Sequence, residues 1–360
     1  MTHTPHDPGN QPATRASELA PESAEDVLRR RHALREVAQG YRCAQILLTC
    51  VELGVFDVLA GRRAAAGEVA EAVGADARGV ELLLNAATAI GLTDKCDGRF
   101  TNTALTETCL TPGGAGAMTR SLHLERAFYR RWGRLSEAVR TGQRPAEDRR
   151  DEGAGDWVRN FVYGLRDMAR PVAPAIAEAL ELPGDRPLRL IDVGGCHGEY
   201  SMALARRYPL LTATVFELPA VVPFAREIVA EAGLAGRVSV QEGDFQREGL
   251  GGGYDAALVF GVLNGEPPDG RPALIRRVFA ALNPGGRIVM RDFVLDPDRA
   301  GPPEAAVFAL QMLLATDGGG LDTSDDWARW LTEAGFAPPR TIALPSWVGS
   351  ALTVAAKPGR

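Results

Sequence analysis

The segment LRLIDVGGCHGEYSMALARRYP, residues 188–209, decides the fold of this chain of 360 residues. It leads from an apolar strand through Asp192 and a glycine-rich turn into an amphipathic helix. In a doubly wound α/β sheet, ligands bind where the carboxyl end of a strand meets such a turn. Gly194, Gly195 and Gly198 permit unusual backbone angles and let a ligand lie against the main chain. We therefore expect a ligand site between Asp192 and Gly198.

The rest of the C-terminal half alternates apolar strands with helices, which is typical of a parallel sheet covered on both faces. A bridging helix is expected at 157–182, and further helices at 201–208, 221–232 and 323–334. The expected strands are 188–193, 213–218, 238–243, 255–263, 286–293, 340–344 and 351–356. The pattern predicts an α/β fold with a doubly wound, mostly parallel seven-stranded sheet.

The N-terminal half has apolar residues at helical spacing from residue 24 to about 140. Helices at 66–73 and 78–90, followed by a hairpin at 92–103, give the order of a winged helix. The second of these helices, GVELLLNAATAIGL, has almost no side chains that read bases, so we expect packing or dimerisation rather than nucleic-acid binding. The net charge of -6 points the same way.

Two polar segments divide the chain. Residues 1–22 contain too few apolar side chains to offset the entropy of ordering, so a disordered tail is expected there. Residues 141–156 are rich in arginine and acidic side chains and are expected to form an exposed connection. The predicted domains are therefore a helical domain at 23–150 and an α/β domain at 151–360.

Composition narrows the class of protein. The five cysteines are scattered and never form CxxC, so neither a disulfide framework nor a metal site is expected. No apolar run approaches the ~20 residues that cross a bilayer, and the N-terminus does not resemble a signal peptide. We expect a cytoplasmic protein with no membrane partner.

Two more strand ends carry side chains suited to a nucleoside. Glu217, followed by Leu218, ends the second strand, where a carboxylate can accept hydrogen bonds from both ribose hydroxyls. Gly243, Asp244 and Phe245 end the third strand and offer an acid and an aromatic face for adenine. A dinucleotide fingerprint would need glycine at positions 196 and 199, so the spacing argues against a nicotinamide cofactor.

These segments belong to a longer pattern that extends over about residues 30–358. Its other segments are LTCVELGVFDVLA, FELP, GDFQ, VLNGEPPDG, LNPGGRIVMRDFVL and EAGF. The chain resembles the S-adenosylmethionine (SAM)-dependent small-molecule O-methyltransferases of the plant caffeate type and their actinobacterial natural-product relatives.

The resemblance implies a Rossmann-like class I methyltransferase domain with SAM as cofactor and S-adenosylhomocysteine as product. It also implies a helical N-terminal domain that forms a homodimer and lends a wall of each active site to its partner. Asp192 and the glycine turn would hold the methionine end of the cofactor, Glu217 the ribose, and Asp244 with Phe245 the adenine.

The sequence departs from the family pattern at two positions. Cys196 stands where glycine is usual, a change that costs little if the turn has a negative φ there. Asn264 stands where members that deprotonate a phenol usually have histidine. Asparagine can hydrogen-bond a substrate oxygen but cannot accept a proton at neutral pH, so the usual general base is missing.

Several explanations of Asn264 stay open. In the first, the acceptor is already an anion or an acidic phenol, so that proximity supplies most of the rate. Alternatively, the nucleophile is carbon or nitrogen, the reaction is not methyl transfer, or the chain is a non-catalytic SAM-sensing regulator. His123 or Tyr129 is a candidate base from the helical half, whereas His197 is expected to hydrogen-bond locally.

The acceptor site is expected on helices that line the acceptor pocket in this family, which bear Trp157, Phe161, Met168, Phe308 and Met312. Their apolar bulk suits a flat aromatic molecule, although each is also consistent with core packing. The sequence therefore predicts a methyltransferase that acts on a phenolic hydroxyl of an aromatic, polyketide-like natural product.

Overall fold

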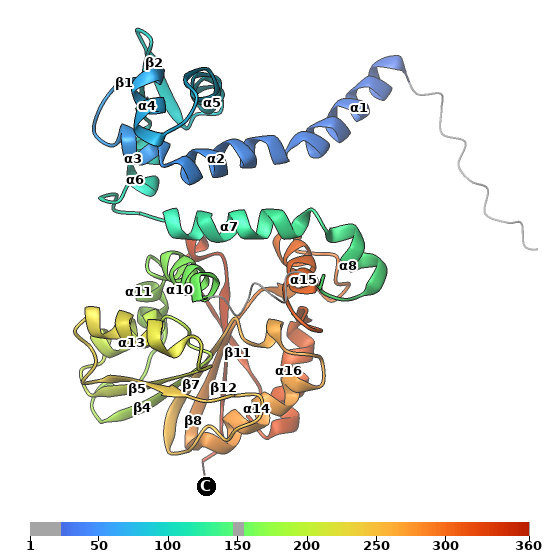
Figure 1. Cartoon of the computed structure of the whole chain (residues 1–360). Coiled ribbons are helices and arrows are strands. Elements are labelled where there is room, and N and C mark those ends of the chain that lie inside the picture. Colours follow the sequence, from blue (N-terminus) through green and yellow to red (C-terminus); the bar gives the residue numbers. More distant parts are fainter. Residues whose placement is uncertain (1–22, 147–154, 360) are drawn as a thin grey trace, which may run out of the picture.

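The structure is a computed structural model that describes residues 23–146 and 155–359. Figure 1 shows a helical N-terminal part and a sheet-containing C-terminal part, with helix α7 lying between them. The predicted tail at 1–22 lies outside the described residues, as do residues 147–154 of the predicted connection.

The N-terminal part is mainly helical, as predicted. Its elements are α1 (Ala24–Gln39), α2 (Tyr41–Leu53), α3 (Val55–Leu59), β1 (Ala64–Ala65), α4 (Ala66–Val73), α5 (Ala77–Ala89), β2 (Thr93–Cys96), β3 (Arg99–Asn102), α6 (Ala104–Leu110), α7 (Thr119–Trp132) and α8 (Leu135–Thr141). The hairpin β2–β3 gains a third strand from β1, in the order β1-β3-β2. Helices α4 and α5 with this hairpin form the expected winged-helix arrangement.

Local capping explains where the winged-helix elements begin and end. The side chain of Asp76 accepts a hydrogen bond from the backbone N–H of Gly79 at 2.8 Å and starts α5. Gly74, with φ 66°, ends α4 in the left-handed region. The helices then bury Leu84 against Phe56 and Phe100 in a core of their own.

The predicted bridging helix at 157–182 is wrong in one respect, because the chain forms two helices there. Helix α10 spans Gly155–Ala169 and α11 spans Ala173–Ala179. Pro171 lacks the N–H that a continuous helix needs, and its ring clashes with the preceding turn. Pro174 then fits in the first turn of α11, where a missing N–H costs nothing.

The C-terminal part contains a seven-stranded sheet in the order β11-β12-β8-β7-β4-β5-β6. The strands are β4 (Leu188–Val193), β5 (Leu211–Glu217), β6 (Val238–Glu242), β7 (Tyr254–Phe260), β8 (Leu282–Arg291), β11 (Arg340–Ala343) and β12 (Ala351–Ala356). Strand β12 runs antiparallel to both neighbours, and the other adjacent pairs are parallel. The strand order reverses between β4 and β7, which makes the carboxyl ends of these strands the expected ligand position.

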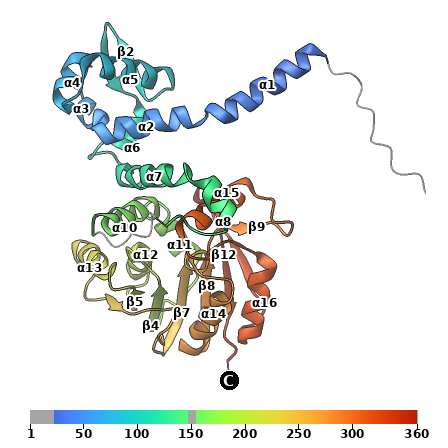
Figure 2. The ribbon, with the colours of Figure 1, turned by 45° about the vertical axis from the view of Figure 1, so that its right-hand side comes forward.

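Helices cover both faces of this sheet (Figures 1 and 2). The remaining elements are α12 (Glu199–Arg207), α13 (Val222–Glu231), the 3-10 turn η1 (Leu263–Gly265), α14 (Gly270–Ala281), α15 (Pro303–Ala315), α16 (Ser324–Ala334), η2 (Ser346–Val348) and the short parallel pair β9 (Val294–Leu295) and β10 (Asp322–Thr323). Leu190 and Ile191 are neighbours on β4 but enter opposite core clusters. This alternation fixes the orientation in which β4 reaches Asp192.

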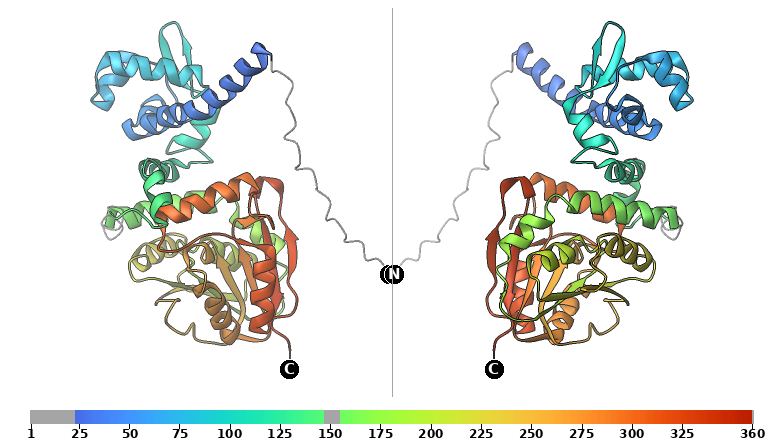
Figure 3. Two further views of the ribbon diagram at one scale, coloured as in Figure 1. Left: turned by 90° about the vertical axis from the view of Figure 1, so that its right-hand side faces the viewer. Right: turned by 90° about the vertical axis from the view of Figure 1, so that its left-hand side faces the viewer.

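Helix α1 differs from the rest, because none of its residues is buried. It projects away from the rest of the molecule in Figures 2 and 3. Leu34 is 72% exposed and Val37 is 82% exposed. Among the described residues, no helix combines the length and the apolar character needed to cross a membrane.

Candidate cofactor and acceptor site

The glycine turn after β4 packs so closely that side chains are excluded from it. Gly194 has φ 62°, and a Cβ there would lie 2.7 Å from Cγ2 of Val262. A Cβ at Gly195 would lie 2.6 Å from Cγ of Asp192. Gly198, with φ 71°, then opens α12. The backbone of this turn is therefore available for close approach by a ligand.

Cys196 does not meet the condition under which its substitution for glycine costs little. Its φ is 47°, in the left-handed region that side chains other than glycine rarely adopt. Burial, and then the neighbouring Glu217, raise the pKa of its thiol well above the ordinary value. The group therefore stays protonated, which argues against a reactive thiolate. No cluster of three His, Cys, Asp or Glu side chains among the described residues could hold a metal ion.

His197 makes the local hydrogen bond that was predicted for it. Its Nδ1 accepts from the backbone N–H of Glu199 at 3.1 Å, at the start of α12. Burial, with a contribution from Arg166, lowers the pKa of the imidazole to about 3. The ring is therefore neutral, and its unprotonated nitrogen is occupied in capping the helix.

Asp192 and Glu217 each leave one buried oxygen without a hydrogen bond from the described residues. Oδ2 of Asp192 accepts from the hydroxyl of Ser201 at 2.8 Å, whereas Oδ1 has no partner. Oε2 of Glu217 is in the same state. Since buried polar atoms are normally satisfied, these two oxygens mark a place where polar groups of a ligand bind. They fit the amino and hydroxyl donors of SAM.

Burial also controls the charge of these two acids. It raises the pKa of Asp192 to about 7 and that of Glu217 to about 8, the latter with a contribution from Asp192. The hydrogen bond from Ser201 opposes the shift at Asp192, and the backbone N–H of Leu218 opposes it at Glu217. At neutral pH much of the acid at these two positions is therefore protonated.

These shifts predict how the stability of the cofactor-free protein depends on pH. Between about pH 4.5 and 8 the folded chain holds protons on Asp192 and Glu217 that the unfolded chain has lost. The free energy of unfolding therefore falls as pH rises through this window. Urea unfolding of the cofactor-free protein from pH 5 to 8 measures the slope. Glu217→Gln should flatten it, whereas Glu242→Gln, at the exposed position paired with residue 217 in the sheet, should not.

The next strand end packs beside Glu217. The N–H of Gly243 donates to the carbonyl of Glu217 at 3.0 Å, and a Cβ at residue 243 would lie 2.2 Å from Cζ of Phe216. Leu218 is 38% exposed and directly follows the candidate ribose acid. Gly243 thus allows β5 and β6 to end side by side, and the exposed Leu218 offers an apolar surface where β5 ends.

Phe245 reaches the glycine turn, whereas the carboxylate of Asp244 is partly occupied. Cε1 of Phe245 lies 3.5 Å from the position that a Cβ on Gly194 would take, and its ring is buried. Oδ1 of Asp244 accepts from the backbone N–H of Gln246 at 2.9 Å, and Oδ2 lies 3.5 Å from Nε of Arg247. The described contacts therefore place the aromatic residue, rather than the acid, directly against the turn.

Asn264 lies in η1, two residues after Val262, which packs on the glycine turn. Its Nδ2 donates to Oδ1 of Asp292 at 2.9 Å, and its carbonyl accepts from the N–H of Gly320 at 2.9 Å. Asp292 immediately follows β8 and was missed by the sequence reasoning, which included it in a predicted strand. The available signal was an acid at the end of an apolar strand, as at Asp192. The structure thus pairs Asn264 with a carboxylate.

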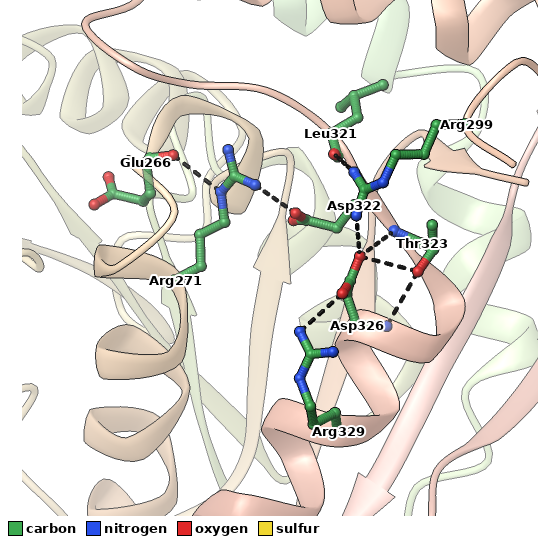
Figure 4. Close-up of polar contacts among 8 residues, drawn as sticks. All are labelled: Glu266, Arg271, Arg299, Leu321, Asp322, Thr323, Asp326 and Arg329. Atoms are coloured by element: carbon green, nitrogen blue, oxygen red, sulfur yellow. Dashed lines mark hydrogen bonds and ion pairs between the residues drawn. The ribbon is translucent and has the colours of Figure 1, made fainter. Parts of the chain in front are cut away.

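A buried ion pair supports the turn that carries Asn264 (Figure 4). Arg271 on α14 pairs with Asp322 on β10, and both side chains are less than one-tenth exposed. Nε of Arg271 also donates to the carbonyl of Glu266 at 3.0 Å, just after η1. A second cluster surrounds Asp326 at the start of α16. Arg271 therefore ties the Asn264 turn to the segment that contains β10.

Two predicted acceptor residues lie together near the start of α10. The rings of Trp157 and Phe161 have centroids 6.0 Å apart, and Phe128 of α7 meets Trp157 edge to face at 6.4 Å. The guanidinium of Arg131 lies 4.4 Å from the Trp157 ring. This group forms an aromatic surface where α7 packs on α10.

The other predicted acceptor residues divide between two places. The rings of Phe308 on α15 and Phe293 lie 4.5 Å apart between centroids and are tilted by 38° to each other. Phe293 directly follows Asp292 in the chain. Met312 is buried on the same helix. Met168 is 44% exposed at the far end of α10 and makes no described aromatic contact with the others. The assignment of Met168 to the acceptor site therefore stays a prediction.

The structure does not bring the candidate bases together with Asn264. His123 lines a polar cavity of about 590 Å³ together with Asp57, Tyr163 and arginines of α7 and α10. No residue of the glycine turn or of η1 lines that cavity. Tyr129 packs against the core of the N-terminal part. The described geometry therefore does not support the prediction that either residue serves as the base.

The sequence matches two family models. Residues 35–112 match an O-methyltransferase dimerisation domain, and residues 151–337 match an O-methyltransferase domain. The second match begins where the α/β domain was predicted to begin and covers the cofactor site. It ends before β11 and β12, which complete the sheet.

Characterised relatives agree with these matches. The 3-hydroxy-5-methyl-1-naphthoate 3-O-methyltransferase of Streptomyces sahachiroi is 33% identical over 87% of this chain and 91% of its own. The N,N-dimethyltransferase OxyT of Streptomyces rimosus is 28% identical over 91% of this chain and 96% of its own.

Among solved structures, human N-acetylserotonin methyltransferase in complex with SAM superposes with a TM-score of 0.81. It shares 27% identity and covers 94% of this chain and 99% of its own. Its bound cofactor agrees with the unsatisfied acids and the glycine turn described above. The chain therefore belongs to the SAM-dependent O-methyltransferases, as a methyltransferase enzyme with a Rossmann-like class I fold that uses SAM as its cofactor.

Proposed function

We propose that this enzyme methylates a phenolic hydroxyl on a bicyclic or larger aromatic natural product. The observation that carries the proposal is the hydrogen-bonded pair of Asn264 and Asp292, which is followed in the chain by Phe293, whose ring packs against that of Phe308. The rings suit a flat aromatic acceptor, and the polar pair suits a hydroxyl at its edge. The resemblance to the naphthoate 3-O-methyltransferase supports this acceptor class.

The residues of the chain divide the work of binding and alignment. The glycine turn with Asp192 would hold the methionine end of SAM, Glu217 the ribose, and Asp244 with Phe245 the adenine. Leu218 would pack beside the nucleoside. When bound, SAM supplies an electrophilic methyl group. Because a carboxylate only accepts hydrogen bonds, Asn264 must turn Nδ2 toward Asp292, and the second N–H of that amide would donate to the acceptor oxygen. Alignment of that oxygen with the methyl group accelerates transfer by proximity.

We also propose that the enzyme works as a homodimer in the cytoplasm, without a nucleic-acid or membrane partner. The match to a dimerisation domain supports the dimer. So does α1, whose apolar side chains are left uncovered within one chain. Burial of that surface against a second copy would remove apolar area from water.

Methylation of nitrogen is the second candidate, because OxyT is an N,N-dimethyltransferase of similar length. An amine acceptor would need its lone pair free, and the pair of Asn264 and Asp292 would bind it in the same way. The two candidates differ in the atom that carries the new methyl group in the product.

The direct test is turnover of an aromatic phenol. With SAM, the enzyme should convert 3-hydroxy-5-methyl-1-naphthoate, or another hydroxylated member of a bicyclic and polycyclic series, to a product heavier by one CH₂. Mass spectrometry detects the product, and nuclear magnetic resonance assigns the methylated atom. Methylation of an aromatic amine instead would favour the second candidate. SAM binding without any methylated phenol across the series would overturn the proposal.

A further inference from the structure

The hydrogen bonds of Asp292 leave part of its carboxylate available to a ligand. Its Oδ1 accepts two hydrogen bonds, from Nδ2 of Asn264 at 2.9 Å and from the N–H of Phe293 at 2.8 Å. The backbone N–H of Asn264 also contributes to stabilising the ionised form. A carboxylate offers about four acceptor positions, so three donors leave one unfilled.

No described cation forms an ion pair with this carboxylate. Arg271, from α14, pairs with Asp322 and with the carbonyl of Glu266. Arg291, the preceding residue, is engaged by Tyr200 and by Ser350 at 2.7 Å. Asp292 is therefore held by neutral donors, which keep it available as an acceptor of protons.

The remaining ionisable neighbours also favour proton uptake. Burial is the main cause that raises the pKa of Asp292 to about 6, and the charge of Asp322 on β10 adds to it. Glu266, the acid that follows η1, is occupied by Nε2 of Gln246 at 2.7 Å. A base of this strength is ionised at pH 7 and yet far more basic than an exposed aspartate.

We propose that Asp292 is the general base of this enzyme and takes the proton from the acceptor hydroxyl that Asn264 holds. This inference rests on the proposed phenolic acceptor. The O–H bond of the phenol breaks and an O–H bond forms on Asp292, so the negative charge passes from the carboxylate to the phenolic oxygen. That oxygen would take the methyl group as the C–S bond of SAM breaks, which leaves neutral S-adenosylhomocysteine. Asp292 then loses the proton to solvent. The carboxylate thereby supplies the function that histidine serves at position 264 in the family pattern.

The rings next to this carboxylate would position an aromatic acceptor close to it. Phe293 is 42% exposed and is the neighbour of Asp292 in the chain, and the tilted ring of Phe308 on α15 packs against it. An aromatic acceptor stacked on Phe293 would bring a ring hydroxyl within reach of both polar residues. The same stack would exclude water from the proton-transfer step.

The test compares the wild type with Asp292→Asn, which keeps an acceptor for Nδ2 of Asn264 but cannot take a proton. With 3-hydroxy-5-methyl-1-naphthoate, kcat/KM of the wild type should rise with pH through about 6 and level off. The variant should lose about 100-fold or more in kcat/KM and lose that limb of the profile, since general-base catalysis contributes about 10²–10⁴-fold. Asp298→Asn, which removes an exposed carboxylate from the loop after β9, should behave as wild type.

A binding measurement gives a readout that does not need turnover. With S-adenosylhomocysteine present, the affinity of the wild type for the hydroxynaphthoate, whose hydroxyl is still protonated, should rise as Asp292 ionises. Quenching of the naphthoate fluorescence measures this affinity. The Asp292→Asn variant should show a flat dependence between pH 5 and 7.5. Calorimetric affinity for SAM should be the same in both proteins, which excludes misfolding as the cause.

Two further arms separate a base from a positioning residue. A nitrated hydroxynaphthoate, whose hydroxyl is far more acidic, should lose much less rate in Asp292→Asn than the parent phenol does. Adding Asn264→His to that variant should restore part of the rate. Equal losses with both acceptors, or an unchanged pH profile, would overturn the inference. Absence of product with the wild type would count against the proposed function instead.

Discussion

Replacement of Glu217 by alanine is expected to weaken SAM binding by about 10- to 100-fold. One oxygen of this buried acid has no partner among the described residues, and a ribose hydroxyl would supply the missing donor. A hydrogen bond to a charged group contributes about 1.5–3 kcal/mol, and each 1.4 kcal/mol changes the affinity about tenfold. Isothermal titration calorimetry measures the loss directly, with Glu242→Ala as the exposed control on the neighbouring strand.

The same experiment carries a second signature. Because the pKa of Glu217 in the empty protein is about 8, most of the acid is protonated at pH 7. Ribose hydroxyls donate best to the ionised form, so binding should release a proton. The binding enthalpy of the wild type should therefore vary with the ionisation enthalpy of the buffer. Glu217→Gln should reduce this variation, and an unchanged affinity together with unchanged proton release would contradict the ribose role.

Replacement of Arg271 by alanine is expected to destabilise the fold by about 3–5 kcal/mol, the usual cost of leaving one partner of a buried ion pair alone. Asp322 would stay buried beside Asp292 without its cation. The loss should grow as pH rises, because removing the cation raises the pKa of Asp322 further and the folded state then binds more protons than the unfolded state. Urea unfolding between pH 5 and 8 measures both effects.

Two comparisons make that result specific. Arg329→Ala removes a half-exposed partner of Asp326 and should cost less than about 1 kcal/mol. The double variant Arg271→Met with Asp322→Leu should be more stable than Arg271→Ala, because a well-packed apolar pair can replace a buried ion pair. A loss below about 0.5 kcal/mol for Arg271→Ala would show that the pair does not hold the Asn264 turn in place.

The sequence was most informative where local rules and burial agree. The expected bounds of β4 match the observed ones, because a nearly continuous apolar run is buried on both faces of a parallel sheet. Helix α4 was also placed at its observed bounds, with Gly74 as its stop signal. The bridging helix failed because apolar spacing continued across Pro171, and the proline should have outweighed that spacing. Periodicity alone cannot tell one bent pair of helices from one helix.

Site residues were harder to predict, since a side chain's role depends on what lies across from it. Asp292 read as part of a strand until folding placed it against Asn264, which is 28 positions away in the chain. The residue type makes His123 a candidate base, but in the structure it lines a different cavity. The backbone angle at Cys196 was likewise undetermined, because a turn with one non-glycine residue leaves its φ open.

Helix α1 has sixteen residues and no buried side chain. Its stability should therefore depend on the protein concentration, because only a second copy of the chain would cover it. An isolated helix of this length is marginal in water. Its amide hydrogens should exchange rapidly in dilute solution and slow down as the protein is concentrated, while those of β4 stay protected throughout. If the partner chain also completes the acceptor site, dilution would reduce turnover before it unfolds anything else, so the enzyme would respond to its own abundance.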